Sequence, residues 1–267
     1  PRIPGGESHV QCGDWLTSHL RKRADKVWEQ QFTYQEKKQS GKIYPGRNII
    51  ASFNLNPKRN FRILLCAHWD TRPWADKDAN PEFHSQPILG ANDGASGVAV
   101  LLEMANILQS HPLEFGVDII LFDLEDLGDY GAEESSSDTL TPFSIGATYF
   151  IENAPKTYRP TFGVLVDMVG DANLNIPQER FSYEYAGDIV EKVWRTAREI
   201  GANAFLSQLG PYISDDHLPF LKRGIKVIDL IDFDYPYWHT THDTPDKCSP
   251  ESLQQVGDVL VNFLYQY

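Results

Sequence analysis

Acidic residues and histidines stand at the ends of the apolar segments of this sequence, where ligands and chemistry gather in α/β proteins. A single acid at such a place is most often a turn or cap residue, and a single histidine is most often structural. A whole set is harder to explain in this way, because carboxylates gathered in one cleft repel one another unless a cation or shared protons stabilise them. Imidazole and carboxylate ligands without thiolates suit a catalytic zinc site with an open position. The set comprises His68, Asp70, Asp93, Glu125, Asp126, Asp167, Asp215, Asp216 and His239.

The segment that ends in Glu125 and Asp126 is the one around which we expect the fold to be organised. Residues 117–123 read VDIILFD, a run too continuously apolar for a half-exposed strand, which predicts a strand covered on both faces. Further buried strands are predicted at 61–67, 161–169 and 225–231, and short strands at 33–34 and 48–53. The predicted buried strands therefore bring members of the acid and histidine set toward a common edge.

Helical spacing of apolar residues alternates with these strands. A first helix is predicted through Cys12, Trp15, Leu16, Leu20 and Ala24, a second from Val98, and others at 144–153, 183–200 and 250–267. This alternation predicts an α/β sandwich, with residues 1–267 forming a single domain. The segment 74–91 is too long for a simple connector, so we expect it to be functional.

Composition limits the partners that this chain can have. It has 267 residues, a formal net charge of −13 and a pI near 5.0. Phosphates would be repelled, which argues against a nucleic acid or an anionic membrane surface as a partner. No apolar run approaches the roughly 18–20 residues that a membrane span needs, so no transmembrane segment is predicted. The three cysteines lack the paired spacing of a structural zinc site, and nothing in the sequence indicates the oligomeric state.

Six motifs occur in an order and spacing that resemble a known family. They are HWD, GANDGASG, FDLED, VLVDMVG, SDDHLPF and WHT, spread over residues 48–264. The chain resembles the zinc-dependent exopeptidases of the M28 type, a family that holds bacterial aminopeptidases and the animal-type glutaminyl cyclases. The resemblance implies a three-layer α/β sandwich with a central mixed, mostly parallel twisted sheet. It also implies metal ligands on the loops at the strand ends.

The resemblance implies a role for each residue of the site. One Zn²⁺ would be held by Asp93, Asp126 and His239, with Glu125 as general acid and base. In the cyclases, the acids at the Glu125, Asp167 and Asp215 positions share protons in a hydrogen-bonded set. In the two-zinc aminopeptidases, the positions of His68 and Asp167 hold a second zinc.

Three features favour the cyclase branch and predict conversion of N-terminal glutamine, with glutamate as an alternative, to pyroglutamate. Asp215 directly precedes an Asp-His pair, Trp238 directly precedes the ligand His239, and the pattern from VIDLI to WHT resembles the cyclases. Purely structural roles for two of these residues stay open: Trp238 can pack in the core, and Asp215 can cap the helix that begins near Leu218. At the level of the whole protein, a two-zinc aminopeptidase and a catalytically inactive binding fold are the competing interpretations.

Departures from the animal cyclases indicate a bacterial-type member. Asp126 stands where those enzymes have a second glutamate, Asp229 stands where they have a histidine, and their tryptophan after the acid pair is missing. We expect the walls of a substrate pocket to come from aromatic residues near the acids, namely Trp238, Trp69, Trp74 and Tyr130. The expected partners are peptide or protein N-termini, and the resemblance to bacterial members implies a secreted or periplasmic location.

Overall fold

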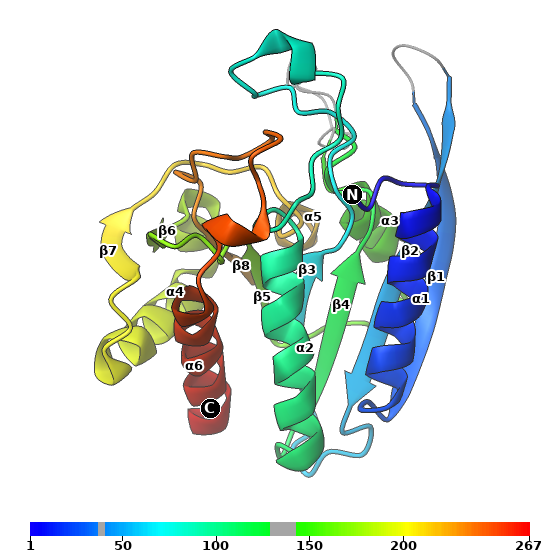
Figure 1. Ribbon diagram of the computed structural model, residues 1–267. Helices are drawn as coiled ribbons and strands as arrows, with labels where there is room; N and C mark the ends of the chain where they lie inside the picture. Colours follow the sequence, from blue (N-terminus) through cyan, green and yellow to red (C-terminus); the bar gives the residue numbers. More distant parts are fainter. Residues whose placement is uncertain (37–40, 129–142) are drawn as a thin grey trace.

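A six-stranded mixed sheet forms the centre of the molecule (Figure 1). The computed structural model describes residues 1–36, 41–128 and 143–267. The strands lie in the order β1-β2-β4-β3-β5-β8. The first two pairs are antiparallel and the other three are parallel, which confirms the predicted mixed, mostly parallel sheet. The strands are β1 (Lys26–Gln35), β2 (Ile43–Phe53), β3 (Arg62–His68), β4 (Gly116–Phe122), β5 (Gly163–Asp167) and β8 (Val227–Ile231).

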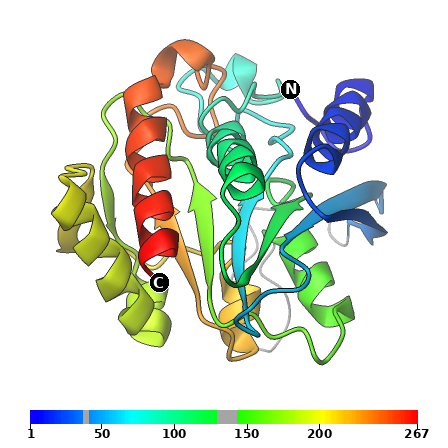
Figure 2. The same ribbon diagram turned by 90° about the horizontal axis from the view of Figure 1, so that it is seen from below.

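Helices cover both faces of the sheet and make the three layers of a sandwich (Figure 2). Helices α2 and α6 lie on one side, and α3 and α5 lie on the other. Helices α1 and α4 share the apolar core of the first side. The helices are α1 (Glu7–Arg21), α2 (Ala95–Ser110), α3 (Ile145–Asn153), α4 (Arg180–Ile200), α5 (Leu218–Lys222) and α6 (Pro250–Gln266). Short 3-10 helices lie at Pro81–Phe83 and Pro245–Lys247.

Strand β4 is buried along its whole length, as its continuous apolar run predicts. Because side chains alternate across a strand, Val117, Ile119 and Leu121 enter the core beneath α2, whereas Ile120 and Phe122 enter the core beneath α3. One strand thus contributes to both apolar cores. This packing fixes where the loop that follows Phe122 begins.

Two parts of the sheet structure were not fully predicted from the sequence. Strands β1 and β2 form a long hairpin in which Lys26 pairs with Ser52 and Gln35 with Ile43, whereas only short strands at 33–34 and 48–53 were expected. The exposed face of β1 carries polar residues, so its apolar alternation is weak. The small parallel pair of β6 (Ile176–Gln178) and β7 (Phe205–Leu209) was not predicted, because its strands are short and partly exposed.

Among the described residues, no helix is both long enough and apolar enough to cross a membrane.

Gly97 permits the close approach of α2 to β5, the strand that ends in Asp167. A Cβ atom at this position would lie 2.0 Å from the backbone oxygen of Val166. Gly257 in α6 is a matched contrast, since nothing lies within 4 Å of the place that a Cβ atom would take there. The first glycine is therefore required by packing, and the second is not.

We predict that Gly97→Ala lowers the free energy of unfolding by about 1–3 kcal/mol, because either α2 or β5 must move to admit the methyl group. Gly257→Ala should instead raise it by roughly 0.5–1 kcal/mol, since alanine loses less backbone entropy in a helix. Urea unfolding of both variants measures the difference. Equal effects of the two substitutions would contradict the packing argument.

Candidate metal centre and catalytic pocket

The candidate site lies on the loops at the carboxyl ends of the parallel strands (Figure 1). Strand β3 ends in His68, β5 ends in Asp167, and Glu125 and Asp126 closely follow β4. Asp93 immediately precedes Gly94, the N-cap residue of α2. Because parallel strands end at the same edge of a sheet, segments far apart in the sequence meet at this one place.

Asp93, Asp126 and His239 form a group that suits a metal ion. Their ligand atoms all lie within 4.8 Å of one another, and all three residues are buried. His239 Nε2 lies 2.9 Å from Asp126 Oδ1 and 3.4 Å from Asp93 Oδ2. That Asp93 oxygen is buried and has no hydrogen-bond partner among the described residues. Two carboxylates and one imidazole with an unsatisfied oxygen match the ligand set of a catalytic zinc.

The pKa shifts of Asp93 and Asp126 also fit a cation bound between the two carboxylates. Burial and the charge of Asp126 raise the pKa of Asp93 well above its ordinary value. Burial would raise the pKa of Asp126 as well, but the neighbouring His239 outweighs it and lowers that pKa to about 2. A divalent cation bound to both carboxylates would offset their repulsion and the cost of burying them.

A second group shares Asp93 with the first. His68 Nε2 lies 3.1 Å from Asp93 Oδ1 and 3.1 Å from Asp167 Oδ1, so the structure brings together the residues expected for a second metal. Burial lowers the pKa of His68, but the charge and hydrogen bond of Asp167 outweigh it and raise that pKa well above the ordinary value. A further group combines His68 with Glu125 and Asp126. The geometry of these residues is therefore compatible with more than one metal position.

Glu125 and Asp215 form an acidic pair beside the metal group. Both are buried. Burial and the charge of Asp215 raise the pKa of Glu125 well above its ordinary value. Burial and the nearby Asp167 raise the pKa of Asp215 to about 7. Carboxyl groups in such a setting can hold and exchange protons near neutral pH, which is what a general acid and base requires.

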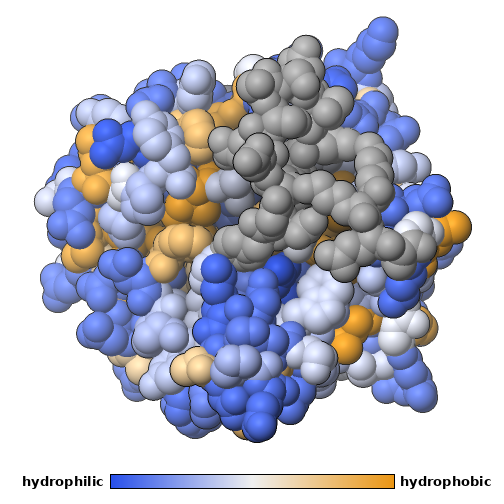
Figure 3. All heavy atoms as spheres, turned by 90° about the horizontal axis from the view of Figure 1, so that it is seen from above, coloured by the Kyte–Doolittle hydropathy of each residue, from blue (hydrophilic) through white to orange (hydrophobic). Residues whose placement is uncertain are grey.

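The metal group and the acids open into one pocket with a volume of about 180 Å³. This is below the roughly 300–1,000 Å³ of pockets that take drug-sized ligands, so it suits a single residue of a peptide. The face over the strand ends carries hydrophobic and strongly hydrophilic side chains close together (Figure 3). The lining residues combine acids with apolar and aromatic groups: Asp93, Glu125, Asp126, Phe143, Asp167, Met168, Tyr212, Ile213, Ser214, Asp215, Ile231, Phe233, Trp238 and His239.

The structure places the four expected aromatic residues in different surroundings. Trp238 lines the pocket and stacks on His239, with ring centroids 4.2 Å apart. Trp69 does not line it, because it is buried in the core and stacks on His9 at 4.3 Å. Trp74 packs with Phe32, Tyr44, Leu124 and Leu127 in a separate apolar cluster. The prediction that Trp69 and Trp74 wall the pocket was therefore wrong, and Tyr130 lies outside the described residues.

Asp70 orients the two acids that follow β4. Its Oδ1 accepts the backbone N–H of Glu125 at 3.1 Å, and its Oδ2 accepts the N–H of Asp126 at 3.2 Å. The same Oδ1 lies 3.5 Å from His68 Nδ1. Asp70 was among the acids that we singled out, but its spacing gave no sign of this supporting role. Contacts to backbone amides leave no periodic signal in a sequence.

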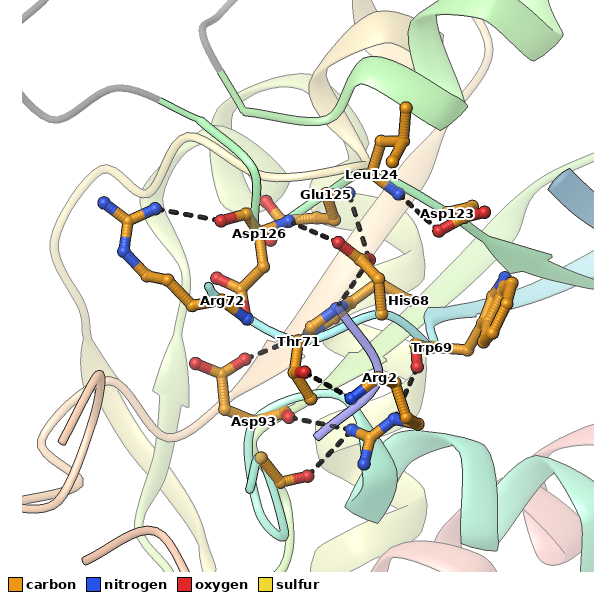
Figure 4. A network of polar contacts seen from close by, with 12 residues as sticks. Arg2, His68, Trp69, Thr71, Arg72, Asp93, Asp123, Leu124, Glu125 and Asp126 are labelled. Carbon is orange, nitrogen blue, oxygen red and sulfur yellow. Dashed lines mark hydrogen bonds and ion pairs between the residues drawn. The ribbon is translucent and has the colours of Figure 1, made fainter. Parts of the chain in front are cut away.

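Arg72 contacts Asp126 (Figure 4), and Asp76 binds the guanidinium of Arg72. The backbone N–H of Arg72 donates to Asp126 Oδ2 at 3.0 Å, and its guanidinium donates to the backbone oxygen of Asp126 at 2.9 Å. Asp76 accepts two bonds from this guanidinium and lies 3.6 Å from His239 Nδ1. These residues lie in or beside the long loop at 74–91 that was expected to be functional. Their individual roles were not predicted.

Three residues of the site region adopt a left-handed backbone that disfavours side chains. Leu124 has φ 59°, Met168 has φ 45° and His239 has φ 53°. Each is a site residue or the neighbour of one. Such conformations cost free energy and persist where the surroundings hold the chain in place. These left-handed residues change the direction of the backbone next to the site residues, whose side chains must point into one pocket.

A buried polar cluster lies behind Asp215. His217 Nε2 lies 3.3 Å from Glu179 Oε2, and its Nδ1 lies 3.8 Å from Asp229 Oδ2. Burial and the charge of Asp215 raise the pKa of Asp229 well above its ordinary value. A carboxyl group and a histidine from two different segments therefore lie side by side behind Asp215.

We predict that Asp93→Ala and Asp126→Ala each abolish stable zinc binding, because each removes one of three ligands. Glu125→Gln should keep zinc at the wild-type level, since an amide preserves the size of the side chain and Glu125 is not in that ligand group. Elemental analysis of the purified, dialysed variants measures the zinc content. Loss of zinc in Glu125→Gln would show that Glu125 also contributes to zinc binding. The assignment of zinc binding to Asp126 alone within this pair would then be wrong.

Comparisons with known proteins agree with this geometry. The model of peptidase family M28 matches residues 48–264. The Bacillus subtilis aminopeptidase YwaD is 28% identical over 220 residues, which cover 76% of this chain and 40% of that protein. The bovine glutaminyl-peptide cyclotransferase is 26% identical over 250 residues, which cover 82% of this chain and 66% of that protein. The chain thus spans less than two thirds of the length of these relatives.

Solved structures resemble the chain over its whole length. A Bacteroides thetaiotaomicron glutaminyl cyclase bound to N-acetylhistamine has a TM-score of 0.91 and 39% identity, covering 100% of this chain and 92% of that one. A Tannerella forsythia glutaminyl cyclase has a TM-score of 0.89 and 36% identity, with 100% and 93% covered. A Zn-dependent exopeptidase from Parabacteroides distasonis has a TM-score of 0.92 and 36% identity, also with 100% and 93% covered. Because the family model spans most of the sequence and the fold agrees, the chain belongs to peptidase family M28.

Proposed function

We propose that this chain is a zinc-dependent glutaminyl-peptide cyclotransferase that converts N-terminal glutamine of peptides and proteins to pyroglutamate. The observation that carries the proposal is Asp215, a third acid that joins Glu125 and Asp167 around a small pocket beside the metal group. In a two-zinc hydrolase, Asp167 would bind the second metal and Glu125 would be the single general base, which leaves Asp215 without a role. In a cyclase, Asp215 would share protons with Glu125 and Asp167. Glutaminyl cyclases among the solved structures, which match the whole chain at 32–39% identity, support the same conclusion.

Asp93, Asp126 and His239 would hold one zinc ion. When bound, zinc acts as a Lewis acid that polarises the γ-carbonyl of the substrate glutamine. Arg72 and Asp76 hold Asp126 and His239 in place, and Asp70 fixes the backbone of Asp126. This support keeps the ligand atoms oriented without help from the substrate.

Glu125 would move the proton. The substrate's own α-amine attacks the γ-carbon, so no nucleophile from the protein is needed. A bond forms between the amine nitrogen and the γ-carbon, and the bond from that carbon to the amide nitrogen breaks. Glu125 accepts the proton that the amine loses and returns it to the departing nitrogen, which leaves as ammonia. Asp215 and Asp167 would share protons with Glu125, and Trp238 would pack on the substrate side chain.

A two-zinc aminopeptidase is the second candidate function. The observation that favours it is the group of His68, Asp93 and Asp167, whose ligand atoms also lie within 4.8 Å of one another. In that case Glu125 would activate a water molecule for attack on the first peptide bond. An inactive fold used for binding is a third candidate, but the complete set of ligands and acids argues against it.

The substrate and the setting follow from the same proposal. The acidic pocket would attract the positive α-amine of a peptide or protein N-terminus. We infer that residues 1–267 act as one catalytic domain. We also infer a secreted or periplasmic location, which rests on the resemblance to bacterial cyclases.

We predict that the protein releases ammonia from a peptide with N-terminal glutamine and lowers the peptide mass by one ammonia. The same peptide with an acetylated N-terminus should remain unchanged, because its nitrogen can no longer attack. An ammonia assay with mass spectrometry measures both. Release of free glutamine without pyroglutamate, or two tightly bound zinc ions per chain, would favour the aminopeptidase instead.

We predict that Trp238→Ala lowers kcat/KM for such peptides by about 10- to 100-fold, the loss expected when an aromatic wall of a small pocket is removed. Trp238→Phe should retain most of the activity, because it restores an aromatic face. Trp15→Ala is the matched control, since Trp15 is 56% exposed on α1. Unchanged kinetics in Trp238→Ala would mean that the substrate does not contact this ring.

A further inference from the structure

The segment that precedes α1 reaches the metal group although it lies outside the residues matched by the family model. Arg2 is its point of contact (Figure 4). The backbone N–H of Arg2 donates to Thr71 Oγ1 at 2.7 Å, and the backbone oxygen of Arg2 accepts the N–H of Thr71 at 3.3 Å. The N-terminal segment is thereby fixed to the loop that follows β3.

The guanidinium of Arg2 joins two loops of the site. Its Nε donates to the backbone oxygen of Trp69 at 2.6 Å, in the loop after β3. Its Nη atoms donate to three backbone oxygens in the segment that leads into α2, those of Leu89 at 3.1 Å, Gly90 at 2.9 Å and Asp93 at 3.5 Å. A planar guanidinium has five donors spread over three nitrogens, whereas an ammonium group has three donors on one nitrogen and cannot reach all four of these oxygens.

The contact with Asp93 completes the support of this residue. The backbone N–H of Asp93 donates to Asp243 Oδ2 at 3.1 Å, and Asp243 Oδ1 accepts the N–H of Asn92 at 2.8 Å. The backbone of Asp93 is therefore held at its nitrogen by Asp243 and at its oxygen by Arg2. Its side chain extends from this fixed backbone toward His239 and His68.

Gly90 lets the segment before α2 approach both Thr71 and Arg2 closely. Gly90 has φ +65°, and a Cβ there would lie 2.3 Å from Thr71 Cγ2, 2.6 Å from the backbone oxygen of Asp93 and 3.1 Å from Arg2 Nη2. The backbone turns tightly at this point, and its oxygens converge on the guanidinium. The converging oxygens would lose their donor if Arg2 were replaced by an apolar residue.

We propose that Arg2 is a positioning residue for zinc, because it holds the backbone of the ligand Asp93 through its guanidinium fork. The proposal rests on the zinc ligands assigned under the proposed function and not on the reaction that they catalyse. Geometry and charge predict opposite effects for the loss of Arg2. A cation near the site repels Zn²⁺, so on charge alone its removal would tighten zinc binding, whereas loss of ligand orientation typically weakens it by about 10- to 100-fold.

The test is the zinc dissociation constant of the full chain, measured by competition with a chromophoric chelator. We expect Arg2→Met and Arg2→Lys both to weaken zinc binding by about 10- to 100-fold, because neither side chain can span the four oxygens. Thr71→Val should weaken it less, since it removes only the hydroxyl that accepts the Arg2 N–H. This variant also serves as a milder probe if Arg2→Met does not fold.

Arg62→Met is the matched control for a loss of stability. Arg62 also donates to backbone oxygens, those of Phe53, Asn54 and Val117, but at the opposite end of β3, and it is paired with Asp118. This variant should lower Tm without changing the zinc dissociation constant.

The possible results separate the proposal from its alternatives. Unchanged or tighter zinc binding in Arg2→Met would overturn it, as would wild-type affinity in Arg2→Lys, because the fork would then not be needed. An equal loss of zinc affinity in Arg62→Met would also overturn it, because the weaker zinc binding of Arg2→Met would then follow from lower stability of the fold and not from the position of Asp93. Wild-type protein that binds no zinc would refute the ligand assignment itself, and with it this proposal.

Discussion

The cost of gathering carboxyl groups in a buried space is the constraint on which this structure depends. Asp93, Glu125, Asp126, Asp167 and Asp215 all line one pocket, and burial opposes the charged form of each. Different parts of the set are stabilised by different means. Asp126 lies against His239 and remains ionised, whereas Glu125 and Asp215 have raised pKa values and can hold protons. Asp93, with its unsatisfied oxygen, is the carboxylate that a cation would complete.

The fold provides the rigid frame that such an arrangement requires. Strand β4 enters both apolar cores, so the loop that carries Glu125 and Asp126 starts from a fixed point. Helix α2 packs closely on β5 and brings Asp93 near Asp167. Around this frame, Asp70 and Asp243 accept backbone N–H groups next to the functional acids. Asp70 and Asp243, which accept backbone N–H groups, thus orient the acids that line the pocket.

The sequence was most informative where strands end. The apolar runs predicted the sheet and its helical cover, and the motifs grouped Asp93, Asp126 and His239, which the structure brings together. It was least informative about the direction of side chains. Trp69 follows His68 directly, yet successive residues point to opposite sides, and its ring enters the core. Arg2 and Asp70 act through backbone groups, whose positions depend on the tertiary fold, so no spacing of residue types could have revealed them.

The two oxygens of Asp70 have an evolutionary consequence for the acid pair. Because they bind the amides of consecutive residues, Glu125 and Asp126, an insertion between these residues would break the pairing. The register of the two acids is therefore locked, while the length of their side chains is free to vary. An exchange of aspartate and glutamate at either position would leave both backbone contacts with Asp70 in place. A shared fold can in this way keep its backbone unchanged while its chemistry is adjusted one methylene group at a time.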